Sequence, residues 1–218
     1  MKVTDISLPI YNDMWAYRPE WKNSIAPIIE TNKGDAGTVY RFNLVSHTGT
    51  YIETSQHKLK NNKLLNNLKP ESFHKKCKVI VLDSVKGKRV TLDAVKGELA
   101  EKKLKIQKND YVIIATGYGK NHRKKNYLED SPYYEELLTN WLIEKQIGLI
   151  GTDTPIIENS DKPYMPVIKM FKANPEMLLL APLLIDTKKI KSGVYTLSCF
   201  PLPIENVSGS QCRAVLIK

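Results

Sequence analysis

Hydrophobic residues along this chain recur with two different periods, which predict alternating strands and helices. Runs typical of strands lie at 78–83, 111–117, 148–154, 177–185, 193–199 and 212–218. Apolar residues at helical spacing mark 92–104 and 133–146, and 162–172 is a third candidate helix. Strands alternate with helices first and follow one another through turns later, so the pattern predicts one mixed α/β domain over residues 1–218.

The N-terminal part reads as strands around an irregular loop. Residues 3–10 form an expected strand that ends at Pro9, and 11–27 are an aromatic-rich segment without a clear period. Two further strands are expected at 25–30 and 38–46, separated by the turn sequence Gly-Asp-Ala-Gly. The second of these strands leads directly to His47.

The segment from His47 to His57 alternates polar and packing residues, as a pleated strand does. One side carries His47, Gly49, Tyr51, Glu53, Ser55 and His57. The other side carries the β-forming residues Thr48, Thr50, Ile52 and Thr54. A fully extended strand would separate the two histidines by about 33 Å. A shared site therefore requires a bend, and Gly49 is the residue best suited to make one.

Composition describes an ordinary water-soluble globular protein. Of 218 residues, 42% are hydrophobic and 26% are charged. The longest apolar run, 177–185, is too short to span a bilayer, and the N-terminus lacks the apolar core of a secretory signal. The three cysteines show no CxxC spacing, which favours free thiols. We therefore expect a cytoplasmic protein that does not bind membranes.

A formal charge of +10 raises the question of nucleic-acid binding. Most lysines are scattered, and the densest basic run, 120–125, has no interleaved aromatic residue and is followed by acidic residues. Nucleic-acid sites usually show a basic stripe with stacking residues or a known module. We expect no nucleic-acid partner, while attraction for an anionic small molecule stays open.

The segment 47–57 resembles the signature of the metal-dependent cyclase family, which includes bacterial kynurenine formamidases and isatin hydrolases. That signature is H-x-G-T-H-x-D-x-P-x-H, and the matching residues are His47, Gly49, Thr50 and His57. Tyr51, Glu53 and Ser55 stand where the family has His, Asp and Pro. Later segments at 115–120, 148–155 and 200–217 are also similar to family segments and occur in the family's order.

The resemblance implies a swivelling β/β/α-type fold, a homodimer and a zinc or manganese ion without an organic cofactor. His47 and Glu53 are the implied metal ligands, and His57 is the implied proton carrier. The family's later His and Glu ligands align with Pro166 and Leu178, which cannot bind a metal, and Glu176 lies two residues from the second of them.

The aromatic N-terminal loop corresponds in the family to a loop that reaches toward the pocket. Trp15, Tyr17 and Trp21 are therefore candidate contacts to an aromatic or heterocyclic substrate. The alternative is that these three side chains cap the core beneath a long loop.

Three functions remain open on these residues. One is a metal-dependent hydrolase of an amide or lactam, with water activated by the ion and His57 as proton shuttle. Another is a metal-free enzyme that uses Glu53 and His57 as an acid/base pair, with Tyr51 as a hydrogen-bond donor. The third is a small-molecule-binding relative that has lost the chemistry.

Overall fold

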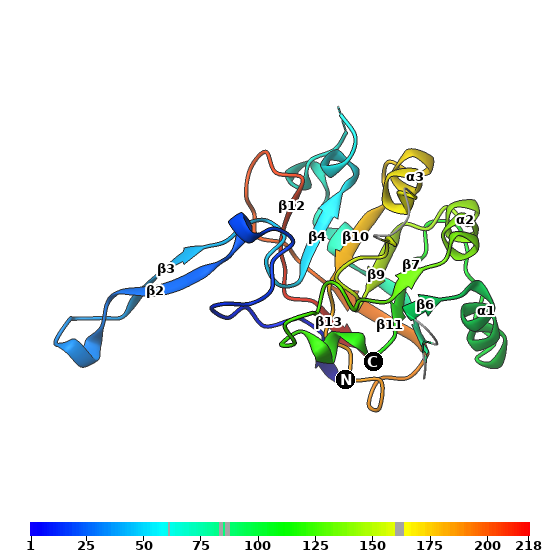
Figure 1. The fold of residues 1–218 in the computed structure, drawn as a ribbon. Helices are drawn as coiled ribbons and strands as arrows, with labels where there is room; N and C mark the ends of the chain where they lie inside the picture. Colours follow the sequence, from blue (N-terminus) through cyan, green and yellow to red (C-terminus); the bar gives the residue numbers. More distant parts are fainter. Residues whose placement is uncertain (61, 83–84, 86–87, 160–163) are drawn as a thin grey trace.

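A computed structural model of the chain describes residues 1–60, 62–82, 85, 88–159 and 164–218 (Figure 1). The strands are β1 (Val3–Asp5), β2 (Ser24–Ile29), β3 (Val39–Asn43), β4 (Tyr51–Thr54), β5 (His74–Val81), β6 (Arg89–Val90), β7 (Tyr111–Ala115), β8 (Tyr133–Tyr134), β9 (Leu149–Thr152), β10 (Leu178–Ala181), β11 (Gly193–Ser198), β12 (Gly209–Gln211) and β13 (Val215–Ile217). The helices are α1 (Leu92–Glu101), α2 (Glu136–Glu144) and α3 (Pro166–Ala173).

A nine-stranded mixed sheet forms the centre of the molecule, in the order β1-β13-β11-β5-β7-β9-β10-β4-β12. Its middle strands β5, β7, β9 and β10 run parallel. The flanking strands pair antiparallel on both sides. The predicted mixed α/β fold is confirmed, whereas its assignment to the swivelling type stays a prediction.

The two faces of the sheet bury separate cores. Helices α1, α2 and α3 lie along one face, where Leu138, Leu142 and Phe171 pack with sheet residues such as Ile114 and Ile150 (Figure 1). The other face holds a second core that the curled sheet and its loops enclose. No helix among the described residues is both long and apolar enough to cross a membrane.

Some predicted boundaries moved because tertiary pairing overrode the local pattern. The strand expected at 78–83 begins earlier, at His74, because its polar start pairs with β11; Asp83 lies outside the described residues. The helix expected from residue 133 begins at Glu136, since Tyr133–Tyr134 forms a short parallel pair with β6. The helix expected at 162–172 begins at Pro166, and 162–163 lie outside the described residues.

The hairpin formed by β2 and β3 projects away from the rest of the molecule (Figure 1). Its two strands pair only with each other among the described residues. Large apolar side chains on it stay in solvent, with Tyr40 51% exposed and Phe42 63% exposed. The hairpin leads directly into the segment that carries His47, which follows β3 by four residues.

Candidate functional site

The backbone between His47 and β4 turns sharply at Gly49, which has a φ of +70°. A Cβ atom there would lie 2.6 Å from the Ile10 side chain, so only glycine fits both the conformation and the space. Thr50 holds the turn in place, because its hydroxyl accepts the N–H of Leu8 at 2.7 Å and donates to the Pro182 carbonyl at 2.5 Å. The bend predicted at Gly49 is therefore present.

Strand β4 presents its side chains to opposite faces, as the alternation predicted. Ile52 belongs to the core on the face away from the helices, whereas Tyr51 and Glu53 line a cavity. Directly after β4, the chain tightens into a 3₁₀ helix at Ser55–His57. The Ser55 hydroxyl donates to the Pro175 carbonyl at 2.7 Å and anchors this turn. The turn brings His57 back over Glu53.

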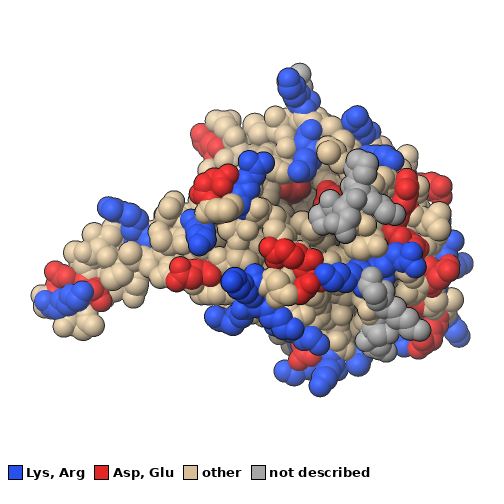
Figure 2. All heavy atoms as spheres, viewed as in Figure 1, with Lys and Arg blue, Asp and Glu red and all other residues tan. Residues whose placement is uncertain are grey.

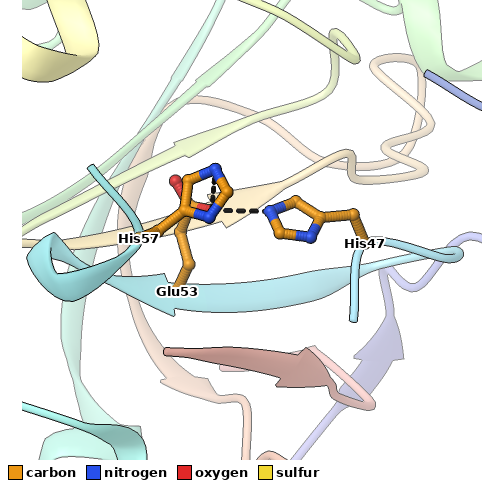
Figure 3. A group of neighbouring side chains, drawn as sticks. All are labelled: His47, Glu53 and His57. Carbon is orange, nitrogen blue, oxygen red and sulfur yellow. Dashed lines mark hydrogen bonds and ion pairs between the residues drawn. The ribbon is translucent and has the colours of Figure 1, made fainter. Parts of the chain in front are cut away.

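His47, Glu53 and His57 meet at one point, although ten residues separate the two histidines (Figure 3). His47 Nε2 lies 2.9 Å from Glu53 Oε2, and His57 Nε2 lies 3.8 Å from the same oxygen. The Glu53 side chain is 4% exposed, that of His47 10% and that of His57 26%. One ligand atom from each residue falls within 4.8 Å of the others, a separation that suits a single ion.

The short contact between His47 and Glu53 requires a proton or a metal ion between the two atoms. A carboxylate oxygen only accepts, so at 2.9 Å His47 Nε2 must carry a proton there or share a metal ion with Glu53. The Ser46 hydroxyl lies 2.8 Å from His47 Nδ1 and can donate or accept. Ser46 therefore supports either form of the imidazole, including the one whose Nε2 is free to bind an ion.

Tyr51 is held by Tyr17 in a chain of hydrogen bonds. The Tyr17 hydroxyl donates to the Pro155 carbonyl at 2.6 Å, so the 3.2 Å contact between the two phenols uses the proton of Tyr51. Burial raises the pKa of Tyr51 well above its usual value, and the nearby Tyr17 and Glu53 raise it further. Tyr51 is therefore a neutral phenol in this structure, and its proton is used in the contact with Tyr17.

The cluster lies in a cavity of about 250 Å³, at the small end of ligand pockets. Tyr17 and Trp21 line it, as predicted for substrate contacts. Trp15 lies behind them, with its ring edge-on to Tyr17 at 5.0 Å and its buried indole Nε1 without a hydrogen-bond partner in the described part of the chain. Tyr17 and Trp21 therefore lie where a substrate could contact them, whereas Trp15 packs behind them, as the alternative predicted.

Three charged residues of the cavity carried no signal in the sequence. Arg18, Lys58 and Glu158 line it together with the cluster. Burial raises the pKa of the Glu158 carboxyl; Lys58 opposes this shift and Glu53 adds to it. No sequence motif connects Glu158 with the residues of β4. The packing of the segment after β9 places Glu158 in the cavity.

Part of the cavity wall beside the cluster is aliphatic. Strand β10 pairs with β4 so that Leu179 stands opposite Glu53, and Leu179 lines the cavity together with Val167 and Ala181. Leu178 belongs to the core on the other face of the sheet. Glu176, considered as a substitute ligand, pairs instead with Lys63 at the surface at 2.5 Å. Among the described residues, His47, Glu53 and His57 are the only group of three or more candidate ligands close enough for one ion.

Asp153, which directly follows β9, has a structural role. Its carboxylate accepts the backbone N–H groups of Thr116 and Gly117 and the Thr116 hydroxyl, at 2.6–3.0 Å. Burial raises its pKa to about 6, while these hydrogen bonds lower it. Since its oxygens hold the turn after β7, Asp153 is not available to a metal.

The sequence and the fold both match known proteins. The sequence model of the cyclase family matches residues 4–159. The kynurenine formamidase of Geobacillus thermodenitrificans is 25% identical over 219 residues, covering 98% of this chain and 93% of the relative. A protein of Bacillus stearothermophilus described as a predicted metal-dependent hydrolase has a TM-score of 0.78 at 23% identity, with 99% and 97% of the two chains covered. Isatin hydrolase A from Labrenzia aggregata, bound to benzyl benzoate, has a TM-score of 0.80 at 21% identity, with 99% and 93% covered. The family match spans most of the chain and the fold agrees along almost all of it, so this chain belongs to the cyclase family.

Proposed function

We propose that this protein is a hydrolase that cleaves an amide or lactam bond of a small aromatic or heterocyclic compound. The observation that carries the proposal is the meeting of His47, Glu53 and His57 in one cavity, with ligand atoms within 4.8 Å of one another. Relatives named kynurenine formamidase and isatin hydrolase, which share the family or the fold, support the reaction class. Tyr17 and Trp21 on the cavity wall provide an aromatic surface for such a ring.

His47 and Glu53 would hold a single zinc or manganese ion. Bound there, the ion would lower the pKa of a coordinated water toward neutrality. The Glu53 carboxylate contributes the negative charge that offsets the ion, and Ser46 fixes the orientation of the His47 ring. The aliphatic side chains of Leu179 and Val167 line the same cavity and exclude water from the part of it that they cover.

His57 is suited to carry a proton rather than to hold the ion. Ligating histidines usually have a hydrogen-bond partner on the second ring nitrogen, as His47 has in Ser46. Within the described residues, His57 pairs only with Glu53, at 3.8 Å, and its side chain is the most exposed of the three. It can therefore take a proton from the attacking water and pass it to the leaving nitrogen.

Metal content of the purified protein tests this function directly. We expect about one equivalent of zinc or manganese per chain by elemental mass spectrometry, as the ligand set suits a single ion. Chelation should remove the ion and the hydrolysis of aryl formamides or isatin-like lactams together, and adding the metal back should restore both. A protein that binds no ion after soaking in either metal would rule out the metal-dependent mechanism.

A metal-free enzyme is the second candidate, favoured by the direct contact between His47 and Glu53. At 2.9 Å, with a proton between them, the two side chains already form a complete hydrogen bond. Glu53 and His57 would then act as an acid/base pair on a cyclisation or dehydration. Activity that survives exhaustive chelation would favour this candidate over the hydrolase. Ligand-dependent thermal stabilisation without turnover would instead favour the small-molecule-binding relative.

We also propose that the β2–β3 hairpin binds a second copy of the chain. A two-stranded hairpin alone is marginally stable in water, and this one exposes several large apolar side chains, among them Ile28, Tyr40 and Phe42. A two-fold interface uses the same patch on both subunits. The hairpin of a second copy would therefore present the same apolar side chains and cover those of the first.

Phe42→Glu is expected to convert a dimer into a monomer, because it places a charge in the apolar interface. Light scattering coupled to size exclusion measures the mass. Leu137→Glu is a matched control, since Leu137 is 66% exposed on α2, away from the hairpin, and this variant should stay dimeric. A wild-type mass of one chain at micromolar concentration would contradict the proposed dimer.

A further inference from the structure

A second cavity, of about 500 Å³, lies beside the first. It is lined by two segments that are far apart in the sequence, the N-terminal loop at 11–22 and the segment 122–129 after β7. Tyr17 and Arg18 line both cavities and so form the wall between them. The basic run noted in the sequence therefore contributes four consecutive residues to a hollow, rather than only to a solvated surface.

Positive charge predominates in this second cavity. Its cationic side chains are Arg18, Lys22, Arg123, Lys124 and Lys125, and its carboxylates are Asp13 and Glu129. Figure 2 shows Lys and Arg side chains gathered below the middle of the molecule, where the N-terminal loop and the segment after β7 lie in Figure 1. A hollow with unbalanced charge of one sign concentrates ligands of the opposite sign.

Most of these cations are not neutralised within the protein. In the described ranges, no ion pair involves Lys22, Lys124 or Lys125. Arg18 approaches Glu20 at 3.9 Å with both side chains largely exposed, a pairing that contributes little in water. The positive charge is thus available to a ligand.

Arg123 is held in place by its neighbours. Its guanidinium carbon lies 4.1 Å from the centre of the Tyr11 ring. The Tyr11 hydroxyl donates to the His122 carbonyl at 2.9 Å, and the Asn23 amide donates to the Tyr11 carbonyl at 2.9 Å. A guanidinium stacked on a fixed ring loses little freedom on binding and can present two N–H groups to a phosphate or carboxylate.

We propose that this second cavity binds a small polyanion, a molecule with clustered phosphate or carboxylate groups. The volume suits a compact molecule of drug size, and the basic residues surround a hollow instead of following the extended stripe that nucleic acid requires. The site does not depend on a metal or on the hydrolase function. An occupant would also contact Arg18, which lines both cavities.

Calorimetric titration with tripolyphosphate and with citrate tests the site on the intact protein. We expect one binding site per chain for at least one of the two, and comparison of the two compounds separates phosphate from carboxylate chemistry. The triple variant Arg123→Gln/Lys124→Gln/Lys125→Gln should bind the preferred compound at least about tenfold more weakly, because charged hydrogen bonds are lost. The double variant Lys124→Gln/Lys125→Gln keeps Arg123 on Tyr11 and should show an intermediate loss.

A matched control separates a site from general charge attraction. The triple variant Lys96→Gln/Lys105→Gln/Lys108→Gln removes the same charge from exposed positions on and after α1, and should bind within about twofold of wild type. Equal losses in the two triple variants, or no binding of either compound to wild type, would overturn the proposal. Affinity for single-stranded oligonucleotides that rises with their length and exceeds that for tripolyphosphate would also overturn it, in favour of a nucleic-acid surface.

Discussion

Replacement of Glu53 by Gln is expected to reduce hydrolysis more than about 100-fold and to release the bound metal. Mutations that only support a metal ligand already cost about 10- to 100-fold, and Glu53 would be a ligand itself. The side chain is 4% exposed between two imidazoles, so no solvent ion can replace its charge. The amide keeps the shape of the carboxyl but removes the charge that offsets the ion.

Two companion variants make this expectation specific. Glu176→Gln removes a carboxylate from the nearby surface pair with Lys63 and should leave metal and activity unchanged. Glu53→Asp restores the residue that the family signature has at this position, with a side chain one methylene shorter, and should keep part of the metal. Metal content and turnover are measured on the same preparations. A Glu53→Gln protein that holds one equivalent of metal would show that the ion, if functional, binds elsewhere.

The alternation expected over residues 47–57 holds within β4, because it depends on local chemistry alone, whereas the residues on either side of β4 form turns. The period of two placed Tyr51 and Glu53 on one face, and the distance between the histidines demanded a bend, for which Gly49 was the best-suited residue. The second bend, the 3₁₀ turn at Ser55–His57, carried no comparable signal. It is fixed by the hydrogen bond from Ser55 to the distant Pro175 carbonyl.

Features that depend on pairing between distant parts of the chain could not be predicted from the sequence. The alignment with the family suggested Leu178 as a former ligand position, but the register of β10 against β4 turns Leu179 to the cavity. A shift of one residue in a strand exchanges its faces, and sequence spacing alone does not fix the register. Glu158 was missed for a related reason. It lines the cavity because of how the loop after β9 packs, and no local sequence pattern predicts the position of that loop.

The charge distribution shows the same limit. The basic run at 120–125 was visible in the sequence, yet its role could not be judged without its neighbours. Arg18 and Lys22, about a hundred residues earlier, complete the hollow that this run lines. Likewise, the strands of the β2–β3 hairpin were predicted, whereas its exposure was not, because an apolar strand pattern looks the same whether a neighbouring sheet or a second chain covers it.

Replacement of His57 by Ala is expected to lower kcat by about 10²- to 10⁴-fold while the metal stays bound. The reason lies in its surroundings, since His57 lacks the second-nitrogen partner that Ser46 gives to His47, and it stands 3.8 Å from Glu53 rather than in direct contact. Such a residue moves protons near the ion without being needed to hold it.

Chemical rescue distinguishes this role from a structural one. The His57→Ala variant leaves space at the end of the 3₁₀ turn, where the native side chain is 26% exposed and a small base can enter. Added imidazole should therefore restore part of the lost turnover in this variant and have little effect on Glu53→Gln, whose defect is in ion binding. Loss of the metal in His57→Ala would instead make His57 the third ligand. The cluster would then be a complete three-ligand site with the proton carried by another group, and Glu158, the remaining acid of the cavity, would be the next residue to replace.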